Sequence, residues 1–371
     1  MVIGMDARAA VEEPAGGGRV VRELLTAFGA VDDLHRFRLY CRQPWTAGPT
    51  GGRFRWSPIR LRDPAWHAAA ATRANGSCDV YLSTNSYLTA WLLTIPSVVL
   101  VYDLVSFIPD AAPQARAARI ELATLGLAVR RAARLVCISQ STERDLLERF
   151  PRAAGKTTVV PLAAGPRFGE PATAHEIGAV TRRYGVEPGG YVLATGTLEP
   201  RKNLQRLIAA HAALPEQLRQ AHPLVIVGPR GWEEDGILAA AGERRADVRL
   251  AGFVPDGDLA RLYAGCSLFC FPSLYEGFGL PVLEAMTAGA PVIASGVSSL
   301  PEVGGDAVAY VEPKDEHSIA TTLERLLRSP EERAALAERA RRRATDFSWE
   351  RCARQLLGEL EAAAATTVVP V

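Results

Sequence analysis

The stretch of the sequence that most constrains the fold is residues 271–289, FPSLYEGFGLPVLEAMTAG. It follows the apolar run Leu268–Phe271, which is typical of a buried strand, and Pro272 ends that strand because proline cannot donate to a sheet ladder. Gly277 and Gly279 then let the backbone turn sharply and approach a ligand closely. The stretch therefore predicts a strand that leads into a glycine-rich loop.

The second half of this stretch predicts a short helix with two carboxylates near its start. Pro281 suits the first turn of a helix, and Gly289 suits its C-terminal end. Glu276 lies on the loop and Glu284 lies early in the helix. Free amides at a helix start favour an anion, and carboxylates accept hydrogen bonds from hydroxyl groups. This combination fits a sugar joined to a phosphate.

The sequence EGFGLP, with seven residues between Glu276 and Glu284, resembles the signature of retaining, two-domain glycosyltransferases of family 4, the group 1 glycosyl transferases. An isolated pair with this spacing is usually two solvated glutamates beside a turn, but the flanking glycines and prolines favour the family. The resemblance implies the GT-B architecture, an α/β fold in which two doubly wound, Rossmann-like domains face each other across a cleft. It also implies that the first domain receives the acceptor and the second holds a nucleotide-diphosphate sugar.

Length and charge agree with a globular protein of two domains. The 371 residues carry a net charge of +1, which argues against a general nucleic-acid binder. The charge is uneven, because residues 1–166 hold 20 basic and 14 acidic side chains, or +6, whereas residues 167–371 hold 22 and 27, or −5. Arginine supplies nearly all of the basic groups, since the only lysines are Lys156, Lys202 and Lys314.

Cysteines and apolar runs indicate the cellular compartment. The six cysteines form no CxxC pair and no His/Cys cluster, so we expect free thiols in a reducing cytosol and no metal site. No signal peptide is evident at the N-terminus, and the most apolar run, Leu88–Val101, is too short to span a bilayer. A cytoplasmic protein is therefore expected.

Apolar strand patterns alternate with helical patterns in both halves, which favours parallel sheets covered on both faces. We place the first domain at residues 1–166 and the second at residues 167–348, with a loose linker over residues 163–190. In the resembled family a last helix, here at about 349–364, crosses back to the first domain. The expected strands are Val2–Met5, Phe37–Tyr40, Phe54–Ile59, Val80–Leu82, Val98–Val101, Leu135–Ile138, Thr158–Pro161, Tyr191–Thr195, Leu224–Val227, Val248–Ala251, Leu268–Phe271, Val292–Ala294 and Val308–Val311.

A second motif, TGTLEPRKN at residues 195–203, lies where a strand meets a helix. We expect Arg201 and Lys202 beside the helix start, at the edge of the sheet where open α/β folds bind ligands, and Asn203 as the helix cap. Two cations in that place suit a diphosphate, although a solvated pair is the alternative. With Gly196, the segment resembles the phosphate-binding strip of the family, and the EPRKN form resembles mannosyltransferases of polysaccharide assembly.

Two elements of the first half also resemble the family. Gly17 and Gly18 lie in a GGGR segment that is similar to its N-terminal glycine loop, which faces the donor diphosphate; a plain tight turn is the alternative. Asp103 follows a buried strand in the segment VYDL, which resembles the HDL-type element near the reacting sugar. Asp103 is therefore a candidate to orient the acceptor, with a strand-end cap as the alternative.

The turn GFVPD resembles the base-binding element of the family, in which backbone groups of Phe253 and Val254 read the nucleobase edge. Asp256 and Asp258 form a DxD motif, which holds a divalent metal in other glycosyltransferases. Their position just before a helix favours capping of its amides instead. We therefore expect no metal and no cofactor.

Taken as a whole, the resemblance implies a metal-independent, retaining hexosyltransferase. Glu284 would hold the ribose of the donor, and Arg201 and Lys202 would stabilise the charge that grows on the diphosphate. Glu276 would hold the donor sugar together with four loop amides. These amides belong to Gly277, Phe278, Gly279 and Leu280. Mannose, carried by GDP, is the first guess for the sugar, and the acceptor is a glycan, a lipid-linked sugar or a small molecule.

Two other functions stay open. A nucleotide-sugar epimerase shares the same architecture, and product analysis with and without an acceptor separates the two activities. A partner subunit that binds a nucleotide sugar without catalysis is the other. Tyr102 and Thr197 keep it open, because they stand where histidine and arginine are common in the family.

The positive first half raises the hypothesis of a surface that contacts an anionic membrane. Basic side chains near such a membrane contribute about 1 kcal/mol each, so a few suffice for weak peripheral attachment. A strand edge kept soluble by its arginines is an equally weighted alternative. The side chains concerned are Arg53, Arg55, Arg60, Arg62, Trp56 and Trp66.

Overall fold

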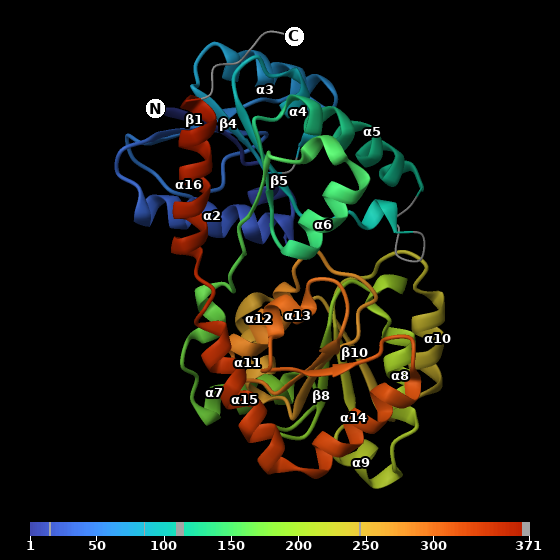
Figure 1. Ribbon diagram of the computed structural model, residues 1–371. Coiled ribbons are helices and arrows are strands. Elements are labelled where there is room, and N and C mark those ends of the chain that lie inside the picture. The colour runs from blue at the N-terminus through green and yellow to red at the C-terminus, as the bar shows by residue number, and fades with distance from the viewer. Residues whose placement is uncertain (15, 85, 109–114, 245, 366–371) are drawn as a thin grey trace. The chain divides into compact units, whose positions relative to one another are not determined.

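The structure is a computed structural model that describes residues 1–14, 16–84, 86–108, 115–244 and 246–365. The chain forms two α/β units, each built on one parallel sheet (Figure 1). The first unit contains the described residues up to 108, those from 115 to 162 and those from 348 to 365, and the second contains residues 163–347. Two Rossmann-like sheets of this kind confirm the predicted α/β fold class.

The first sheet has seven parallel strands in the order β3-β2-β1-β4-β5-β6-β7. Its strands are β1 (Val2–Asp6), β2 (Arg36–Cys41), β3 (Phe54–Pro58), β4 (Val80–Ser83), β5 (Ser97–Val101), β6 (Arg134–Cys137) and β7 (Thr157–Val159). Phe37 and Phe54 are register partners on neighbouring strands, and their ring centroids lie 4.9 Å apart. Phe28 of helix α2 stacks on Phe37 at 5.2 Å, so aromatic rings join the helix to this end of the sheet.

The helices of the first unit are α1 (Ala9–Glu12), α2 (Gly17–Val31), α3 (Ala65–Asn75), α4 (Tyr87–Leu92), α5 (Ala115–Arg131), α6 (Gln140–Arg149) and α16 (Trp349–Ala365). Helix α16 packs against α2 and against strands β4, β5 and β6. Glu359 of α16 also accepts a hydrogen bond from Thr158 at 3.1 Å and pairs with Arg134 at 3.7 Å. The last described helix is therefore part of the first unit.

The second sheet has six parallel strands in the order β10-β9-β8-β11-β12-β13. Its strands are β8 (Val192–Thr195), β9 (Leu224–Val227), β10 (Val248–Gly252), β11 (Leu268–Phe271), β12 (Val292–Ser295) and β13 (Ala309–Val311). The helices of this unit are α7 (Ala174–Arg183), α8 (Leu204–Ala212), α9 (Glu216–Ala221), α10 (Asp235–Glu243), α11 (Asp256–Gly265), α12 (Leu280–Thr287), α13 (Leu300–Gly304), α14 (Glu316–Arg328) and α15 (Pro330–Ala344).

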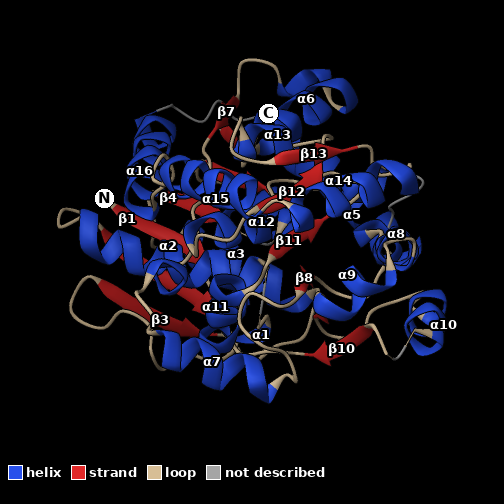
Figure 2. Cartoon of the chain, turned by 90° about the horizontal axis from the view of Figure 1, so that it is seen from below, coloured by secondary structure: helices blue, strands red, loops and turns tan. Residues whose placement is uncertain are grey.

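Helices cover both faces of the second sheet, as expected for a parallel sheet whose strands are apolar throughout (Figures 1 and 2). Helices α8, α10 and α14 lie on one side, and α7, α11, α12 and α15 lie on the other. Leu193 and Phe269 of two neighbouring strands are completely buried between these layers. Burying a side chain of this size stabilises the fold by about 1.5–3 kcal/mol.

The strand predictions match the structure closely, but one connecting segment was predicted wrongly. Residues 163–190 were expected to form a loose linker, yet they contain helix α7, which packs against α11. Thr173 and Glu176 form a capping box at the start of α7, and this is a local helix signal that the glycines and prolines nearby concealed.

The surface predicted for membrane contact is also partly wrong. Trp66 is fully buried beneath Arg8, so it cannot anchor the protein in a bilayer. The Arg53 guanidinium donates to the backbone carbonyls of Asp32 and Gly29, which ties it to the end of α2. Strand β3 is the edge of its sheet, as the alternative interpretation of these arginines required.

The six cysteines, which are Cys41, Cys78, Cys137, Cys266, Cys270 and Cys352, are all buried and free. Among the helices of the described residues, none combines the length and the apolar character that crossing a bilayer requires.

Candidate functional site

The candidate site lies on two loops that follow neighbouring strands of the second sheet. Residues 196–203 follow β8 and residues 272–279 follow β11, and the two strands are register partners. The Arg201 carbonyl joins the loops, because it accepts hydrogen bonds from the Leu274 amide at 2.8 Å and the Ser273 hydroxyl at 3.1 Å. Both loops therefore lie at the carboxyl edge of the sheet, where open α/β folds bind ligands.

The local geometry of the second loop follows from its glycines and proline. Gly279 has a φ of 103°, a left-handed conformation that side chains rarely adopt, and a Cβ atom there would lie 2.6 Å from Leu300. Helix α12 begins at Leu280 with Pro281 in its first turn, and Gly289, with a φ of 79°, lies just beyond its end. The predicted order of strand, glycine loop and short helix is therefore correct.

A buried ion cluster forms where the two loops meet. Glu276 Oε1 accepts from Lys202 Nζ at 2.6 Å and from the Ser273 hydroxyl at 2.7 Å, and it lies 2.9 Å from Arg201 Nη1. The Glu276 amide donates to Ser298 Oγ at 3.0 Å, and the Glu276 carbonyl accepts from Ser299 Oγ at 2.8 Å. The short, charged contacts of the Glu276 side chain therefore all reach the same oxygen, Oε1, and hold the carboxylate in one orientation.

Burial and neighbouring charges shift the ionisation of this cluster. Glu276 and Lys202 are each 8% exposed. Burial alone would raise the pKa of Glu276, but Arg201 and Lys202 outweigh it and lower that pKa to about 2. Burial lowers the pKa of Lys202, Arg201 lowers it further, and Glu276 opposes both effects. The site thus holds an ionised carboxylate against two cations in a region of low polarity.

Arg201 is less available than the sequence indicated. Its guanidinium pairs with Glu199, which is 3% exposed, and donates to the Tyr275 carbonyl at 2.9 Å. The structure therefore places two carboxylates, Glu199 and Glu276, beside the two predicted phosphate-binding cations. Glu199 is part of the quoted motif, but its role depends on a three-dimensional contact that the motif alone does not reveal.

The position of Lys202 depends on its neighbours in the first loop. Gly196 has a φ of 138°, and a Cβ atom there would come within 3.1 Å of the Lys202 side chain, so the glycine provides the space that the lysine occupies. The Lys202 ammonium also lies 4.9 Å from the centre of the Phe271 ring.

Asn203 does not cap helix α8 with its side chain, so this prediction is wrong. The residue has a φ of 58°, and its side-chain amide donates to the carbonyls of Pro272 at 2.9 Å and Pro313 at 2.6 Å. Asparagine tolerates this left-handed conformation better than most residues do. Asn203 thus ties the two site loops and a third segment together.

Glu284, the second predicted carboxylate, lies on α12 and is 1% exposed. It accepts a hydrogen bond from Tyr263 Oη at 3.4 Å, and the same hydroxyl lies 3.1 Å from Thr195 Oγ1 at the end of β8. Because a buried carboxylate is costly without hydrogen bonds, the neutral Tyr263 hydroxyl helps to stabilise it there. Sequence patterns gave no sign of Tyr263, since it belongs to a different helix.

The predicted base-binding turn follows β10. Gly252 has a φ of 66°, Phe253 is 60% exposed and Val254 is buried. Asp258 of the DxD motif pairs with Arg183 at 2.8 Å and accepts from the Tyr184 hydroxyl at 3.0 Å. Asp258 thus holds α7 against α11.

Three predicted site residues lie in the first unit. Gly17 and Gly18 form the first turn of α2 rather than a loop before it, and a side chain on Gly18 would collide with the Glu13 carbonyl. Gly18 is therefore required for close packing of α1 and α2. Asp103 Oδ1 accepts from the Val105 amide at 2.9 Å, which is the strand-end cap that was the alternative for this residue.

Comparison with known proteins finds a match over part of the chain to the family that the motifs resemble. The family described as "Glycosyl transferases group 1" matches residues 185–343. The O-antigen chain mannosyltransferase B of Escherichia coli is 38% identical over 225 residues, which is 60% of this chain and 59% of that protein. The chain thus aligns with less than two thirds of that relative.

Solved structures share the fold over nearly the whole chain. A sucrose-phosphate synthase from Thermosynechococcus elongatus aligns with a TM-score of 0.80 at 20% identity, covering 98% of this chain and 100% of the other. Anabaena HepE in complex with UDP and glucose aligns with a TM-score of 0.78 at 18% identity, covering 97% and 99%. These alignments confirm the predicted GT-B fold, and they extend to the first unit, which lies outside the family match.

Proposed function

We propose that the protein is a retaining glycosyltransferase, because residues 185–343 match the family of group 1 glycosyl transferases and the chain has the GT-B fold. It transfers a hexose from a nucleotide-diphosphate sugar to a hydroxyl group of a glycan, a lipid-linked sugar or a small molecule. The name of the relative from Escherichia coli supports mannose as the sugar, and the UDP bound by the structural neighbour supports a nucleotide-linked donor. GDP-mannose is the first donor to test.

The observation that carries this proposal is the buried ion cluster of Arg201, Lys202 and Glu276. Lys202 has three N–H groups, and among the described residues Glu276 accepts a hydrogen bond from one of them. The remaining N–H groups are available to a diphosphate oxygen, while Glu276 keeps Oε2 for a hydroxyl of the donor sugar. Negative charge that develops on the diphosphate as the glycosidic bond breaks is stabilised by cations that are already fixed in place.

The remaining predicted residues complete the proposed donor site. Glu284 binds the ribose hydroxyls, and the backbone of Phe253 and Val254 contacts the nucleobase. The amides of the second loop assist Glu276 at the sugar, and the start of α2, at Gly17 and Gly18, contributes amides to the diphosphate. The loop amides belong to Gly277, Phe278, Gly279 and Leu280, and Gly196 contributes the space beside Lys202. Asp103 orients the acceptor hydroxyl, which attacks from the face that the diphosphate leaves.

A panel of nucleotide sugars tests the donor. A ligand that binds only the folded protein stabilises it by about 2.7 kcal/mol at a concentration of 100 times its Kd, so the true donor raises the melting temperature measurably. We expect GDP-mannose to give the largest shift. Stabilisation by none of the GDP, UDP, ADP and TDP sugars would contradict the donor site.

Product analysis then tests the reaction. Transfer with retention gives a product in which the new anomeric bond has the same configuration as the donor, and proton NMR reads this configuration directly. Isomerised nucleotide sugar formed without acceptor would show an epimerase, and donor binding with no product under any condition would show a subunit without catalysis. Either result would replace the proposed transfer.

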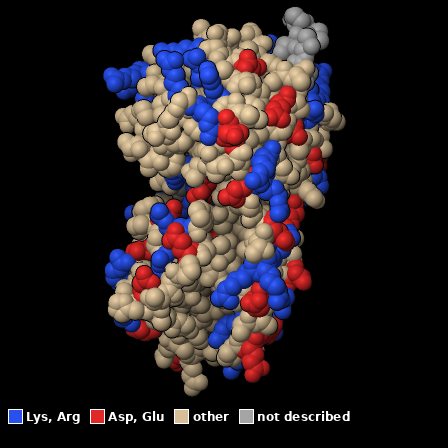
Figure 3. Space-filling view, turned by 90° about the vertical axis from the view of Figure 1, so that its left-hand side faces the viewer, with Lys and Arg blue, Asp and Glu red and all other residues tan. Residues whose placement is uncertain are grey.

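We place the protein in the cytoplasm, with a peripheral contact to an anionic membrane through the first unit. Arg55, Arg60 and Arg62 are exposed on the edge strand β3 and the segment after it. Figure 3 shows basic side chains gathered on the upper part of one face of the molecule. Three arginines contribute about 3 kcal/mol near an anionic bilayer, which is enough for weak binding.

Vesicle sedimentation at low salt tests this contact. We expect recovery with phosphatidylglycerol vesicles to exceed recovery with phosphatidylcholine vesicles and to fall when the three arginines are replaced by glutamine. Replacing Arg325, Arg328 and Arg342 of the second unit by glutamine serves as the control, since these arginines are also exposed. Equal recovery with both lipids would favour an acceptor that is free in solution.

A further inference from the structure

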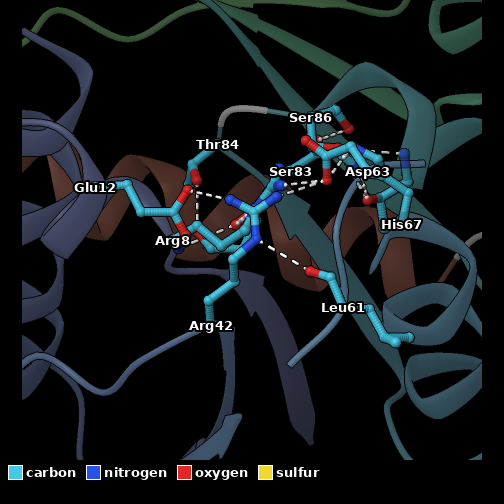
Figure 4. A network of polar contacts seen from close by, with 11 residues as sticks. Arg8, Glu12, Arg42, Leu61, Asp63, His67, Ser83, Thr84 and Ser86 are labelled. Carbon is cyan, nitrogen blue, oxygen red and sulfur yellow. Dashed lines mark hydrogen bonds and ion pairs between the residues drawn. The ribbon is translucent and has the colours of Figure 1, made fainter. Parts of the chain in front are cut away.

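A second polar network lies at the carboxyl edge of the first sheet (Figure 4). Asp6 ends β1, Arg42 follows β2, and Ser83 and Thr84 lie at the end of β4. These strands are neighbours in the parallel sheet, so their ends converge. The place corresponds to the edge at which the second unit carries its donor site, and in an open α/β sheet this edge is the place for a ligand.

The buried part of this network, Asp6 and Arg8, is held in place by several contacts. Asp6 is completely buried, and its carboxylate accepts from Arg8 Nη2 at 3.1 Å and Nε at 3.3 Å. The Arg8 guanidinium lies 3.8 Å from the centre of the Trp66 ring, so it is stacked as well as paired. Thr84 Oγ1 donates to the Asp6 carbonyl at 2.6 Å. Arg8 therefore has a fixed orientation.

The solvent-exposed part of the network contains two half-exposed carboxylates, Glu12 and Asp63. Asp63 Oδ1 accepts from Arg8 at 3.1 Å and from Arg42 at 2.9 Å, and it lies 3.4 Å from His67 Nε2. Glu12 Oε2 accepts from the other terminal nitrogen of Arg42 at 2.6 Å. Among the described residues, no hydrogen bond uses Asp63 Oδ2 or Glu12 Oε1. Arg42 thus holds two carboxylates side by side, each with one oxygen open to solvent.

The charge of the network selects the ligand. Asp6, Glu12 and Asp63 carry three negative charges, and Arg8 and Arg42 carry two positive ones. His67 is neutral near pH 7, because burial and then the Arg8 charge lower its pKa from 6.5. These five side chains therefore carry a net charge of −1, both arginines are paired with carboxylates, and the two open carboxylate oxygens can only accept hydrogen bonds. Such a site attracts neutral hydroxyl groups and repels a phosphate.

We propose that Glu12 and Asp63 bind neighbouring hydroxyl groups of a neutral glycan acceptor and that they exclude acceptors phosphorylated at this sugar. The inference rests on the proposed function, because it assigns the acceptor of that reaction to a class. Arg42 and Arg8 act as positioning residues, since they hold the two carboxylates without facing the ligand themselves.

The first experiment measures binding, which does not depend on turnover. Neutral methyl glycosides and disaccharides, mannosides among them, are titrated against the full chain by saturation-transfer NMR, each beside its own phosphate monoester. We expect at least one neutral probe to bind about tenfold more tightly than its phosphate ester. Tighter binding of the phosphate esters, or no binding of any neutral probe, would overturn the proposal.

The second experiment uses Glu12→Gln and Asp63→Asn, two exposed changes that keep the side-chain size. Each should raise the acceptor KM about tenfold, because a charged hydrogen-bond acceptor is lost, while kcat and the donor KM stay unchanged. In the double variant, the acceptor KM values for neutral and phosphorylated acceptors should differ less than they do in the wild type. Asp33→Asn and Glu148→Gln, at exposed carboxylates of the same unit, are the matched controls and should leave all constants unchanged.

The outcomes separate this inference from the proposed function. Transfer that continues in the two variants with an unchanged acceptor KM would overturn the glycan site alone. Absence of transfer to any acceptor, with the neutral probes still bound through Glu12 and Asp63, would overturn the proposed reaction and leave the glycan site standing. An equal rise of the donor KM in the variants would show that the network acts through the fold rather than on the acceptor.

Discussion

The two units contain the same electrostatic arrangement at the same edge of their sheets. In each, two cations converge on one oxygen of a carboxylate and leave the other oxygen free of hydrogen bonds from the described residues. The carboxylates are Glu276 in the second unit and Asp63 in the first. The four cations are Arg201 and Lys202 in the second unit and Arg8 and Arg42 in the first.

The two carboxylates differ in burial. The Glu276 side chain is 10% exposed and that of Asp63 is 51% exposed. Charges in a region of low polarity act strongly on each other and on a bound substrate, whereas water and salt screen exposed charges. The same arrangement thus serves two tasks: the buried one can stabilise a change in charge during a reaction, and the exposed one can recognise a ligand.

The largest expected difference concerns kcat. Lys202→Ala should lower kcat about 100-fold to 1000-fold, the loss typical for one fixed group that stabilises developing charge. Arg42→Ala, the counterpart in the first unit, should raise the acceptor KM and leave kcat nearly unchanged. Steady-state kinetics with both substrates varied gives these constants, and Lys314→Ala is the control at an exposed lysine of the second unit. Equal losses of kcat in the Lys202 and Arg42 variants would contradict the assignment of catalysis to the buried cluster and of ligand recognition to the exposed one.

Stability against acid should also separate the two carboxylates. The folded-state pKa of Glu276 is lowered from 4.5 to about 2, so its contribution to stability is complete above the unfolded value and is lost as pH falls from 4.5 to 2. This contribution amounts to roughly 3 kcal/mol. Glu276→Gln should therefore destabilise the protein strongly at pH 7 and progressively less below pH 4.5.

Asp63→Asn provides the comparison, because an exposed pair contributes only about 0–1 kcal/mol. Urea unfolding of both variants and the wild type at pH 7, 5 and 3.5 measures the three free energies of unfolding. If the free energies of unfolding of Glu276→Gln and wild type differed by the same amount at every pH, Arg201 and Lys202 would not lower the pKa of Glu276.

Glu284 should affect the donor more than the chemical step. Glu284→Ala removes a buried acceptor for the proposed ribose hydroxyls, and the donor KM should rise about 10-fold to 100-fold with a much smaller change in kcat. Tyr263→Phe, which removes one hydrogen-bond partner of Glu284, should give a weaker change in the same direction. A fall in kcat with an unchanged donor KM would assign Glu284 to the reaction itself.

The smallest expected effect is that of a chelator. The proposed diphosphate charge is offset by Arg201 and Lys202, whose positions are fixed by protein contacts, so EDTA should change the transfer rate by less than about twofold. The rate is measured before and after dialysis against EDTA and after readdition of manganese. Loss of activity that manganese restores would show that Arg201 and Lys202 alone do not offset the charge of the diphosphate.

Much of the fold could be predicted because its signals are local. Apolar runs of four to six residues gave the strands of both sheets, and Pro281 and Gly289 set the ends of α12 correctly. Residues 163–190 misled the prediction because their Gly and Pro content obscured the capping box at Thr173. Short helices such as α4, with Ser86 as its cap, contain too few turns for the spacing of their apolar residues to show a helical period.

The candidate site was predictable in its members but not in its pairings. Arg201, Lys202 and Glu276 were all identified, yet Glu276 lies 75 residues from Arg201 and 74 from Lys202, and no local pattern predicts an ion pair across that distance. The side chain of Asn203 joins segments that are 69 and 110 residues away, which is why its predicted capping role was wrong. The network around Asp63 was missed because its members come from strand β1, helices α1 and α3 and separate loops, which only the fold brings together.

Helix α16 has a consequence for how the chain acquires its structure. Residues of the first unit come from both sides of the second in the sequence, and α16 covers β4, β5 and β6. During synthesis on the ribosome, residues 163–347 can therefore complete their sheet and core before the first unit is covered by its last helix. For that period, strands made early expose apolar surface, so removal of residues 349–365 should aggregate the first unit and leave the second folded.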